Sequence, residues 1–479
     1  MTLESFSKKI KLVVVFTFLL AVLASCSKKD DIGPGTNPPT SSPSSAKEIA
    51  NVNILKSDNA NLTGDGYVYK SGAKIYITVP LGSNLSSVKV VFNLSAKASV
   101  KIDGLTLTNN TGLLDLTKTL TATIVAEDGS TSVYTLLAQL GIKDIDALIY
   151  PFIEKYGIPS ASYAIGKNSS ESLVYKNASG FAWVETKERA TPNHLFRLAS
   201  MTKQHTAIAI MTLIQQGKMS INDLVFGPTG ILKASFPTVG QLSAKVTVKH
   251  LLEHTAGYTG DPMFTSTYAG YTLDQRIQVM LNSTQSEPGT KYYYYNMGYG
   301  VLGKVIEVVS GKDYETYLKE IYAPIGITRL RLASATTANI PSDEAVCYPQ
   351  GNSTAYGNEM SVMKAAAGIA VTTDDLFKIL YAVDGGAIRQ DILSPSIKTL
   401  MFTPSDAFSG YAKGWRTNHT LFSGFYHGGN LAGTGTFWIY GTEYSVAILL
   451  NSRNNEDAFD TDLIVLTNNV MKKAKELAL

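Results

Sequence analysis

The stretch FRLASMTK, residues 196–203, decides how the rest of this chain is interpreted. It places Lys203 three residues after Ser200, and a long apolar run follows at once. Three residues make about one helical turn, so both side chains fall on one face of a helix predicted to begin at Ser200 and to close at 215–217. A serine and lysine so spaced form a recognised nucleophile-and-base pair for acyl transfer. The N-terminus of this helix would also offer N–H groups to a developing oxyanion.

The Ser-x-x-Lys spacing is weak evidence alone, and a solvated surface pair is its common alternative. The same spacing recurs at Ser5, Ser25, Ser44, Ser71, Ser86 and Ser361. Ser200 differs because a strand-like segment, 195–198, precedes it and a mostly apolar helix follows. A lysine in the first turn of a buried helix is costly unless other groups use it. The sequence must therefore supply partners for Lys203.

The first candidate partner segment is EPGTKYYYYNMGYGVLG, residues 287–303. Its Pro-Gly pair predicts a turn, its tyrosines an extended run and its glycines the start of a helix. Tyr294 and Asn296 are two residues apart and point to one side of an extended segment. A phenol beside an amine can share its proton, and an amide can orient lysine or substrate. Packing aromatics are the alternative, and a second Tyr-x-Asn at 356–358 shows that the motif is common.

The second candidate segment is YHGGN, residues 426–430, followed by an alternating run at 433–440 that predicts a strand. Glycines let a backbone run close to a ligand. His427, at the head of that predicted strand, would supply a positive or hydrogen-bonding tip. A lone histidine in a loop is the alternative.

Taken together and in this order, the three motifs resemble those of the serine acyl-transferases that include class C β-lactamases, low-molecular-mass D,D-peptidases, D-aminopeptidases and related esterases. Three further segments agree. TVKHLLEHTAG at 247–257 is similar to the family's LLxHTSG, 296–311 is similar to its NxGYxxLGxxIExxSG, and 366–376 resembles a stretch before a helix near the site. The resemblance covers residues from about 145 to the C-terminus.

The resemblance implies an α+β fold, in which an antiparallel sheet and a helical subdomain form a β-lactamase/transpeptidase-like domain. It implies an acyl-enzyme mechanism in which Ser200 is the nucleophile and Lys203 and Tyr294 transfer protons. Asn296, His427 and Gly429 would orient the substrate. The backbone N–H groups of Ser200 and Asn430 would donate to the oxyanion. Whether Lys203 or Tyr294 is the base stays open.

One departure bears on the substrate. The third motif in β-lactamases of this family normally begins with lysine, as Lys-Thr-Gly or Lys-Ser-Gly, whereas His427 stands there here. His-x-Gly is more usual among D-specific peptidases and some penicillin-binding hydrolases. We therefore expect a cell-envelope serine hydrolase acting on a small amide or ester, with D-amino-acid peptides favoured and peptidoglycan fragments as candidate substrates. The alternatives are a β-lactamase, a carboxylesterase or a non-catalytic surface binding protein. The six histidines show no His-x-His or His-Glu-x-x-His pattern and there is no cysteine cluster, so no metal or cofactor is expected.

The N-terminus predicts an anchored envelope protein. Three lysines precede an apolar run at 12–24, which is short for a bilayer span but suits a signal peptide. LASC at 23–26 resembles a bacterial lipoprotein box with Cys26 as the lipidated residue, the alternative being an ordinary secretory signal. SKKDD at 27–31 is similar to a surface-export signal of Bacteroidetes-type lipoproteins, or is a plain charged tether. These features predict an outer-membrane lipoprotein, held at the membrane by a lipid and exposed at the surface if the export signal acts.

Four regions are predicted along the chain: signal peptide 1–25, tether 26–46, β-sandwich 47–140 and hydrolase domain 141–479. The sandwich is expected to be antiparallel, with strands at 74–79, 88–92, 120–125 and 133–137 and a turn at Asp128-Gly129. It resembles Ig-like modules that act as spacers or bind glycans, and a spacer is favoured.

In the hydrolase domain, early strands at 162–165 and 173–175 should pair with late ones at 436–440 and 445–450, under a C-terminal helix.

Composition limits the remaining choices. Cys347 is the only cysteine besides Cys26, so no disulfide within the lipidated chain is expected. Removing 1–25 lowers the formal net charge from +3 to about +1, which gives no electrostatic footprint for nucleic acid.

Overall fold

The computed structural model describes residues 42–351, 353–357, 359–386 and 388–479. The predicted signal peptide, Cys26 and most of the predicted tether lie outside the described residues.

The N-terminal strands form two sheets around a core of their own, in which Val79, Val90 and Ile124 are fully buried. One sheet has the order β1-β4-β7 and the other β2-β3-β9-β8-β5-β6. The strands are β1 Ile49–Asn53, β2 Tyr67–Ser71, β3 Lys74–Pro80, β4 Val88–Leu94, β5 Ser99–Ile102, β6 Leu105–Thr106, β7 Thr111–Leu114, β8 Leu120–Val125 and β9 Thr131–Gly141, with short 3₁₀ turns η1 Lys56–Asp58 and η2 Thr108–Asn110.

The four strands predicted in this region are confirmed, as is the turn between β8 and β9, where Gly129 has a φ of +84°. The prediction of a wholly antiparallel arrangement is wrong at one place, because β3 and β9 pair in parallel. Between these two strands the chain crosses to the other sheet through β4 and returns. Such a long crossover is what a parallel pair needs, whereas a tight hairpin can join only antiparallel strands.

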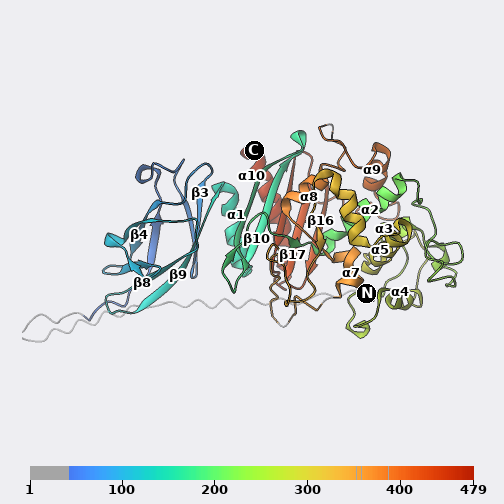
Figure 1. Ribbon diagram of the computed structural model, residues 1–479, viewed down its shortest axis with the longest axis horizontal. Helices are drawn as coiled ribbons and strands as arrows, with labels where there is room; N and C mark the ends of the chain where they lie inside the picture. Colours follow the sequence, from blue (N-terminus) through green and yellow to red (C-terminus); the bar gives the residue numbers. More distant parts are fainter. Residues whose placement is uncertain (1–41, 352, 358, 387) are drawn as a thin grey trace, which may run out of the picture. The chain divides into compact units, whose positions relative to one another are not determined.

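A six-stranded antiparallel sheet forms the centre of the C-terminal part, in the order β12-β11-β10-β18-β17-β16 (Figure 1). Its strands are β10 Ser160–Lys167, β11 Ser172–Trp183, β12 Glu188–Arg189, β16 Phe425–Leu431, β17 Thr434–Tyr440 and β18 Tyr444–Leu450. Early and late strands meet where Ala161 pairs with Leu450, as predicted. Helices α1 Lys143–Lys155 and α10 Ala458–Glu476 pack on one face, and their apolar side chains share one core with that face.

The other face of the sheet is covered by helices whose apolar side chains form a second, larger core. They are α2 Thr202–Gln215, α3 Val248–Leu252, α4 Leu273–Leu281, α5 Asn296–Ser310, α6 Tyr314–Tyr322, α7 Met360–Ala367, α8 Thr373–Leu380 and α9 Pro395–Phe402. A small sheet, β13 Phe196–Arg197, β15 Ile369–Val371 and β14 Arg331–Leu332, lies among them, with 3₁₀ turns η3 Asn168–Ser170, η4 Ala199–Met201, η5 Ser243–Lys245, η6 Ser266–Tyr268 and η7 Ala323–Ile325.

The predicted start of the nucleophile helix is corrected by two residues. Ser200 lies in the 3₁₀ turn η4, and α2 begins at Thr202. Ala199 has a φ of +50°, a left-handed conformation that an L-residue adopts at a cost and that an α-helix cannot contain. This residue sets the sharp bend that presents the serine. Every residue of α2 from 202 to 213 is buried, so its position is fixed from all sides.

Among the described residues, none of the helices has the length and apolar character that crossing a bilayer requires.

Asp146 of α1 forms a buried polar junction between the N-terminal strands and the six-stranded sheet. Its carboxylate accepts hydrogen bonds from Tyr163 of β10 and Tyr175 of β11, both at 2.7 Å. It also accepts from Thr78 of β3 at 2.9 Å and from Gln139 of β9 at 3.2 Å. The side chain is fully buried, and this burial raises the pKa of the carboxyl.

Replacing Asp146 by alanine should lower the free energy of unfolding by about 3 kcal/mol, because several buried donors lose their acceptor at once. Chemical denaturation followed by tryptophan fluorescence measures this change. Asp144→Ala is the matched control, since Asp144 is exposed on the same helix and should cost only a few tenths of a kcal/mol. Equal effects of the two substitutions would contradict the role given to Asp146.

Candidate active site

The structure brings Ser200, Lys203 and Asn296 together. The Lys203 Nζ lies 3.2 Å from the Ser200 Oγ, 2.9 Å from the Asn296 Oδ1 and 3.0 Å from the carbonyl oxygen of Ala366. These acceptors come from η4, from the first residue of α5 and from α7, so three separate segments converge on one amine. Lys203 has no exposed surface. Asn296 therefore supplies one of the three acceptors that surround this lysine.

Burial changes the proton affinity of Lys203. It lowers the pKa of the amine to about 7, the Asp261 carboxylate raises the pKa in part, and the Arg416 guanidinium lowers it further. An ammonium is less stable away from water, which is why desolvation is the largest of these effects. Near neutral pH a large fraction of the lysine is thus an uncharged amine, which can accept the proton of the neighbouring hydroxyl.

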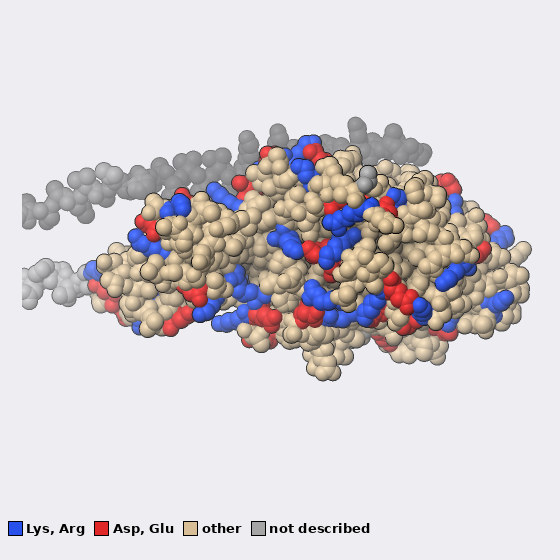
Figure 2. Space-filling view, turned by 45° about the horizontal axis from the view of Figure 1, so that its top comes forward, with Lys and Arg blue, Asp and Glu red and all other residues tan. Residues whose placement is uncertain are grey.

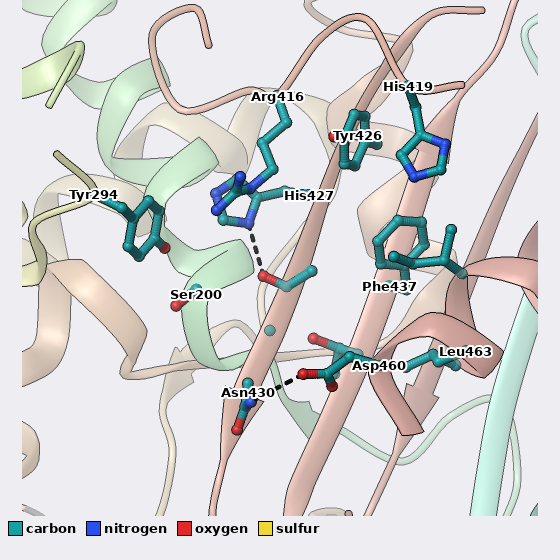
Figure 3. A pocket seen from close by; sticks show the side chains of 14 residues that line it. Ser200, Tyr294, Arg416, His419, Tyr426, His427, Asn430, Phe437, Asp460 and Leu463 are labelled. Carbon is teal, nitrogen blue, oxygen red and sulfur yellow. Dashed lines mark hydrogen bonds between the residues drawn. The ribbon is translucent and has the colours of Figure 1, made fainter. Parts of the chain in front are cut away.

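The Tyr294 hydroxyl points toward Ser200 in the pocket (Figure 3). Burial raises the pKa of the phenol to about 12, although the neighbouring Ser200 hydroxyl and the charge of Arg416 oppose this rise. The Lys203 Nζ lies 4.9 Å from the centre of the tyrosine ring. The phenol therefore keeps its proton at neutral pH and is suited to donate it. These two pKa directions favour Lys203 as the group that begins a reaction unprotonated.

Asp261 is a site residue that the sequence analysis missed. One of its oxygens accepts from the backbone N–H of Asn296 at 2.7 Å and from the Asn296 Nδ2 at 3.1 Å, and the other accepts from the Met297 N–H at 3.2 Å. The carboxylate thus caps the N-terminus of α5, where negative charge is stabilised. It also fixes the amide so that its oxygen faces Lys203. No motif spacing connects residue 261 with residue 296, so only the fold reveals the pair.

His427 lies within β16, and its predicted place at the head of a single strand is wrong. The run at 433–440 forms a second strand, β17, which pairs with β16 as a hairpin. The His427 Nδ1 lies 2.7 Å from the Gly428 carbonyl oxygen, and its Nε2 lies 3.4 Å from the Tyr411 hydroxyl. Burial lowers its pKa well below the usual value, and the charges of Arg416 and Lys203 add to this. His427 is therefore a neutral hydrogen-bonding group rather than a positive tip.

Gly429, two residues after His427, allows close contact between β16 and the nucleophile segment. A Cβ at Gly429 would lie 2.1 Å from the Leu198 carbonyl oxygen and 2.2 Å from the Thr436 Oγ1. The Thr436 hydroxyl donates to that same carbonyl at 2.8 Å. Strand β16 can thus approach Ser200 only because residue 429 has no side chain.

Asn430 presents its backbone to the open edge of the sheet. Tyr426 exchanges two backbone hydrogen bonds with Arg416 on the side away from β17. Backbone groups alternate along a strand, so Gly428 and Asn430 direct their N–H groups to that same side. The predicted role of Asn430 as an oxyanion donor requires an N–H on this open side of the strand. Its side chain turns the other way, and the Asn430 Nδ2 lies 3.3 Å from the Asp460 Oδ2.

An aromatic layer that the sequence did not indicate supports Tyr294. The ring of His254 lies 4.4 Å from that of Tyr294 and 4.7 Å from that of Tyr411. The His254 Nδ1 accepts the Tyr295 N–H at 3.1 Å, and burial holds its pKa well below the usual value. The Arg416 guanidinium covers the Tyr294 ring at 5.1 Å. His254 belongs to the HTAG segment, which was noted in the sequence without a role.

Figure 3 shows the pocket that these groups surround, with a volume of about 320 Å³. Ser200 and Tyr294 lie on one side, and Tyr426, Phe437 and Leu463 are grouped on the other. Asn430 and Asp460 lie close together at one end. Among the described residues, no three His, Cys, Asp or Glu side chains are placed to hold a metal ion.

An antiparallel sheet covered by helices on both faces, with a serine beside a buried lysine at its edge, is the arrangement of a β-lactamase-like fold. The chain belongs to the β-lactamase family, whose model matches residues 145–469. Members of this family are serine hydrolases that act on small molecules or peptides.

Two curated relatives show the extent of the similarity. Protein flp of Staphylococcus aureus (strain N315) is 28% identical over 325 residues, which cover 64% of this chain and 63% of that protein. Penicillin-binding protein 4* of Bacillus subtilis (strain 168) is 25% identical over 314 residues, which cover 60% and 66%. The chain thus spans a little less than two thirds of the length of these relatives.

Solved structures agree with this fold. The octameric penicillin-binding protein homologue from Pyrococcus abyssi has a TM-score of 0.56 and 25% identity, covering 70% of this chain and 77% of its own. The D-amino acid amidase from Ochrobactrum anthropi SV3, complexed with D-phenylalanine, has a TM-score of 0.58 and 23% identity, covering 70% and 99%. The predicted α+β, β-lactamase-like fold is confirmed.

The rate of covalent labelling of Ser200 should rise with pH through a midpoint near 7, because only the uncharged form of Lys203 accepts the serine proton. The pKa values of His254 and His427 lie well below this range, so neither histidine accounts for the midpoint. Stopped-flow labelling with a fluorophosphonate measures the profile. Arg416→Gln removes a nearby positive charge and should move the midpoint upward. A midpoint that does not move would argue against titration of the lysine.

Gly429→Ala should reduce kcat/KM by more than 100-fold, because the new Cβ would displace β16 from the Leu198 carbonyl oxygen and misplace the oxyanion donor. Steady-state kinetics measure this loss, and circular dichroism tests whether the sheet is intact. A folded Gly429→Ala protein with activity near that of the parent would show that this close approach is not needed.

Proposed function

We propose that this protein is a serine hydrolase that works through an acyl-enzyme on a small amide or ester, with D-amino-acid peptides favoured. The observation that carries the proposal is the buried Lys203 amine, held between the Ser200 hydroxyl, the Asn296 amide and a backbone carbonyl, with its pKa lowered to about 7. Such a desolvated amine is costly to maintain, and proton transfer from the serine gives it a use.

The reaction would begin when the Ser200 Oγ attacks the substrate carbonyl and its proton passes to Lys203. The carbonyl oxygen becomes an oxyanion, which the N–H groups of Ser200 and Asn430 would stabilise. Tyr294 would then donate its proton to the leaving nitrogen or oxygen as the bond to the carbonyl carbon breaks. Lys203 would return a proton to the phenolate. Water would next attack the acyl-enzyme, release the acid and restore the Ser200 hydroxyl.

Arg416 supports a substrate that carries a carboxylate. Its guanidinium lines the pocket beside Tyr294 and His427. No carboxylate of the described residues forms an ion pair with it. A cation that is largely removed from water and paired only with aromatic rings would gain from an incoming carboxylate. A peptide with a free terminal carboxylate provides one, as does a penicillin, so both belong in the substrate panel. Simple esters lack it.

The remaining sequence predictions complete the proposal. We place the protein at the bacterial cell envelope, as an outer-membrane lipoprotein held through Cys26, with a tether over 26–46 and an Ig-like spacer over 47–140 before the hydrolase domain, 141–479. The separate core of the N-terminal strands supports the last boundary. On the face seen in Figure 2, basic and acidic side chains lie interspersed.

Fluorophosphonate treatment of residues 27–479 should add one adduct to the parent protein and none to Ser200→Ala, as read by intact mass. This result would justify kinetic assays with D-peptides, penicillins and esters. A folded parent protein that takes up no adduct would favour the non-catalytic binding protein instead. Labelling of Ser200→Ala at the parent rate would place the nucleophile elsewhere.

Tyr294→Phe should slow turnover by roughly 10²–10⁴-fold, because the phenol is the proton donor to the leaving group. The best substrate of the panel supplies the kcat for this comparison. Tyr293→Phe is the matched control, since Tyr293 is half exposed and adjacent in sequence. A Tyr294→Phe protein with near-normal kcat would remove this residue from the mechanism.

A further inference from the structure

The pocket that contains Ser200 extends past the edge strand β16 to helix α10. Beyond the strand its wall is formed by apolar and aromatic side chains from β16, β17 and α10, together with a histidine before β16. These are Tyr426, Phe437, Leu463, Ile464 and His419. Figure 3 shows Tyr426, His419, Phe437 and Leu463 grouped on the side of the pocket opposite Ser200. None of them has a part in the mechanism proposed above.

Gly428 makes this part of the pocket accessible from the nucleophile. Tyr426, Gly428 and Asn430 alternate with His427 and Gly429, so the position of a side chain at 428 is on the α10 side of the sheet. A Cβ there would lie 3.1 Å from the nearest atom of the Phe437 ring, closer than an ordinary van der Waals contact. The corresponding position in Lys-Thr-Gly and Lys-Ser-Gly motifs carries a hydroxyl. Gly428 thus lies directly against the Phe437 ring, and a larger residue at 428 would push into the pocket that this ring lines.

The charges near this wall are already compensated. The Asp460 carboxylate accepts two hydrogen bonds from Arg453, both at 2.9 Å, and one from Asn430. Burial lowers the pKa of His419, so its ring is neutral at neutral pH. That ring is stacked on Phe422 with centroids 4.5 Å apart and meets the edge of Tyr426 at 5.1 Å. The wall is thus a packed aromatic surface, and burial of an apolar group against it is favourable.

We propose that the region between Gly428, Phe437, Leu463 and Ile464 is a subsite for an aromatic or branched apolar group of the substrate, next to the bond that is cleaved. This inference rests on the proposed hydrolase function. It makes Gly428 a specificity-determining residue, because the size of its side chain controls entry to the subsite. The enzyme should therefore distinguish substrates by an apolar side chain as well as by the carboxylate that Arg416 would bind.

Two boronic acids test the subsite without knowledge of the natural substrate. The boron of methylboronic acid or benzylboronic acid accepts the Ser200 Oγ and becomes tetrahedral, which mimics the intermediate of hydrolysis. Competition against fluorophosphonate labelling of Ser200 gives an inhibition constant for each compound. The benzyl compound should bind at least tenfold more tightly than the methyl compound, which corresponds to about 1.4 kcal/mol.

Variants locate the effect. Gly428→Ala and Ile464→Phe should each reduce this preference at least fivefold, since the first closes the entrance and the second fills the subsite. Val465→Phe is the matched control for the second, because Val465 is partly exposed on the same helix and does not line the pocket. It should leave the preference as in the parent. If Gly428→Ala fails to fold, Ile464→Phe decides the result.

The outcomes separate this inference from the proposed function. A labelled Ser200 with a benzyl preference below threefold, or with a preference that neither variant reduces, would overturn the subsite and leave the hydrolase intact. A folded parent protein without any labelling would overturn the proposed function, and the subsite with it. A tenfold preference that both subsite variants reduce and Val465→Phe retains would support both.

Discussion

The burial of the Lys203 amine is the constraint on which the rest of the site depends. A charged ammonium in this place would lack water, so the protein must either supply acceptors or lower the pKa, and it does both. Each acceptor is fixed in turn. Asp261 holds Asn296 at the start of α5, and the Ala366 carbonyl belongs to α7, which packs with α2 in one core. The large helical core therefore holds the Lys203 Nζ beside the Ser200 Oγ.

Two neutral histidines lie in the same buried region. Desolvation lowers the pKa of His254 and of His427, and the charges of Lys203 and Arg416 lower both further. A protonated imidazole at either place would repel an ammonium and the Arg416 guanidinium. As neutral rings they pack against aromatic groups and accept or donate hydrogen bonds. The histidine in the third motif thus fills the place of a lysine without adding a third positive charge to a dry site.

The sequence predicts well what is encoded over short distances. Ser200 and Lys203 are one helical turn apart, and Tyr294 and Asn296 are two residues apart in an extended segment. Local geometry was therefore enough to predict that the side chains of each pair lie on one side. The central strands were predictable from alternation. The errors concern backbone detail: the left-handed Ala199 delays the helix, and the hairpin of β16 and β17 was taken for one strand because glycines hide its first half. Asp261, Tyr411 and Arg416 were missed because only tertiary packing connects them with the motifs.

The pairing of β10 with β18 has a consequence for biosynthesis. Ala161 pairs with Leu450, and β16, which carries Gly429 and Asn430, also follows nearly all of the helical region in the chain. A ribosome has therefore made almost the whole polypeptide before the nucleophile can meet its oxyanion donors. A nascent chain that already contains Ser200 and Lys203 still lacks the strand that carries Gly429 and Asn430. The order of elements along the chain therefore delays assembly of the candidate site until synthesis is nearly finished.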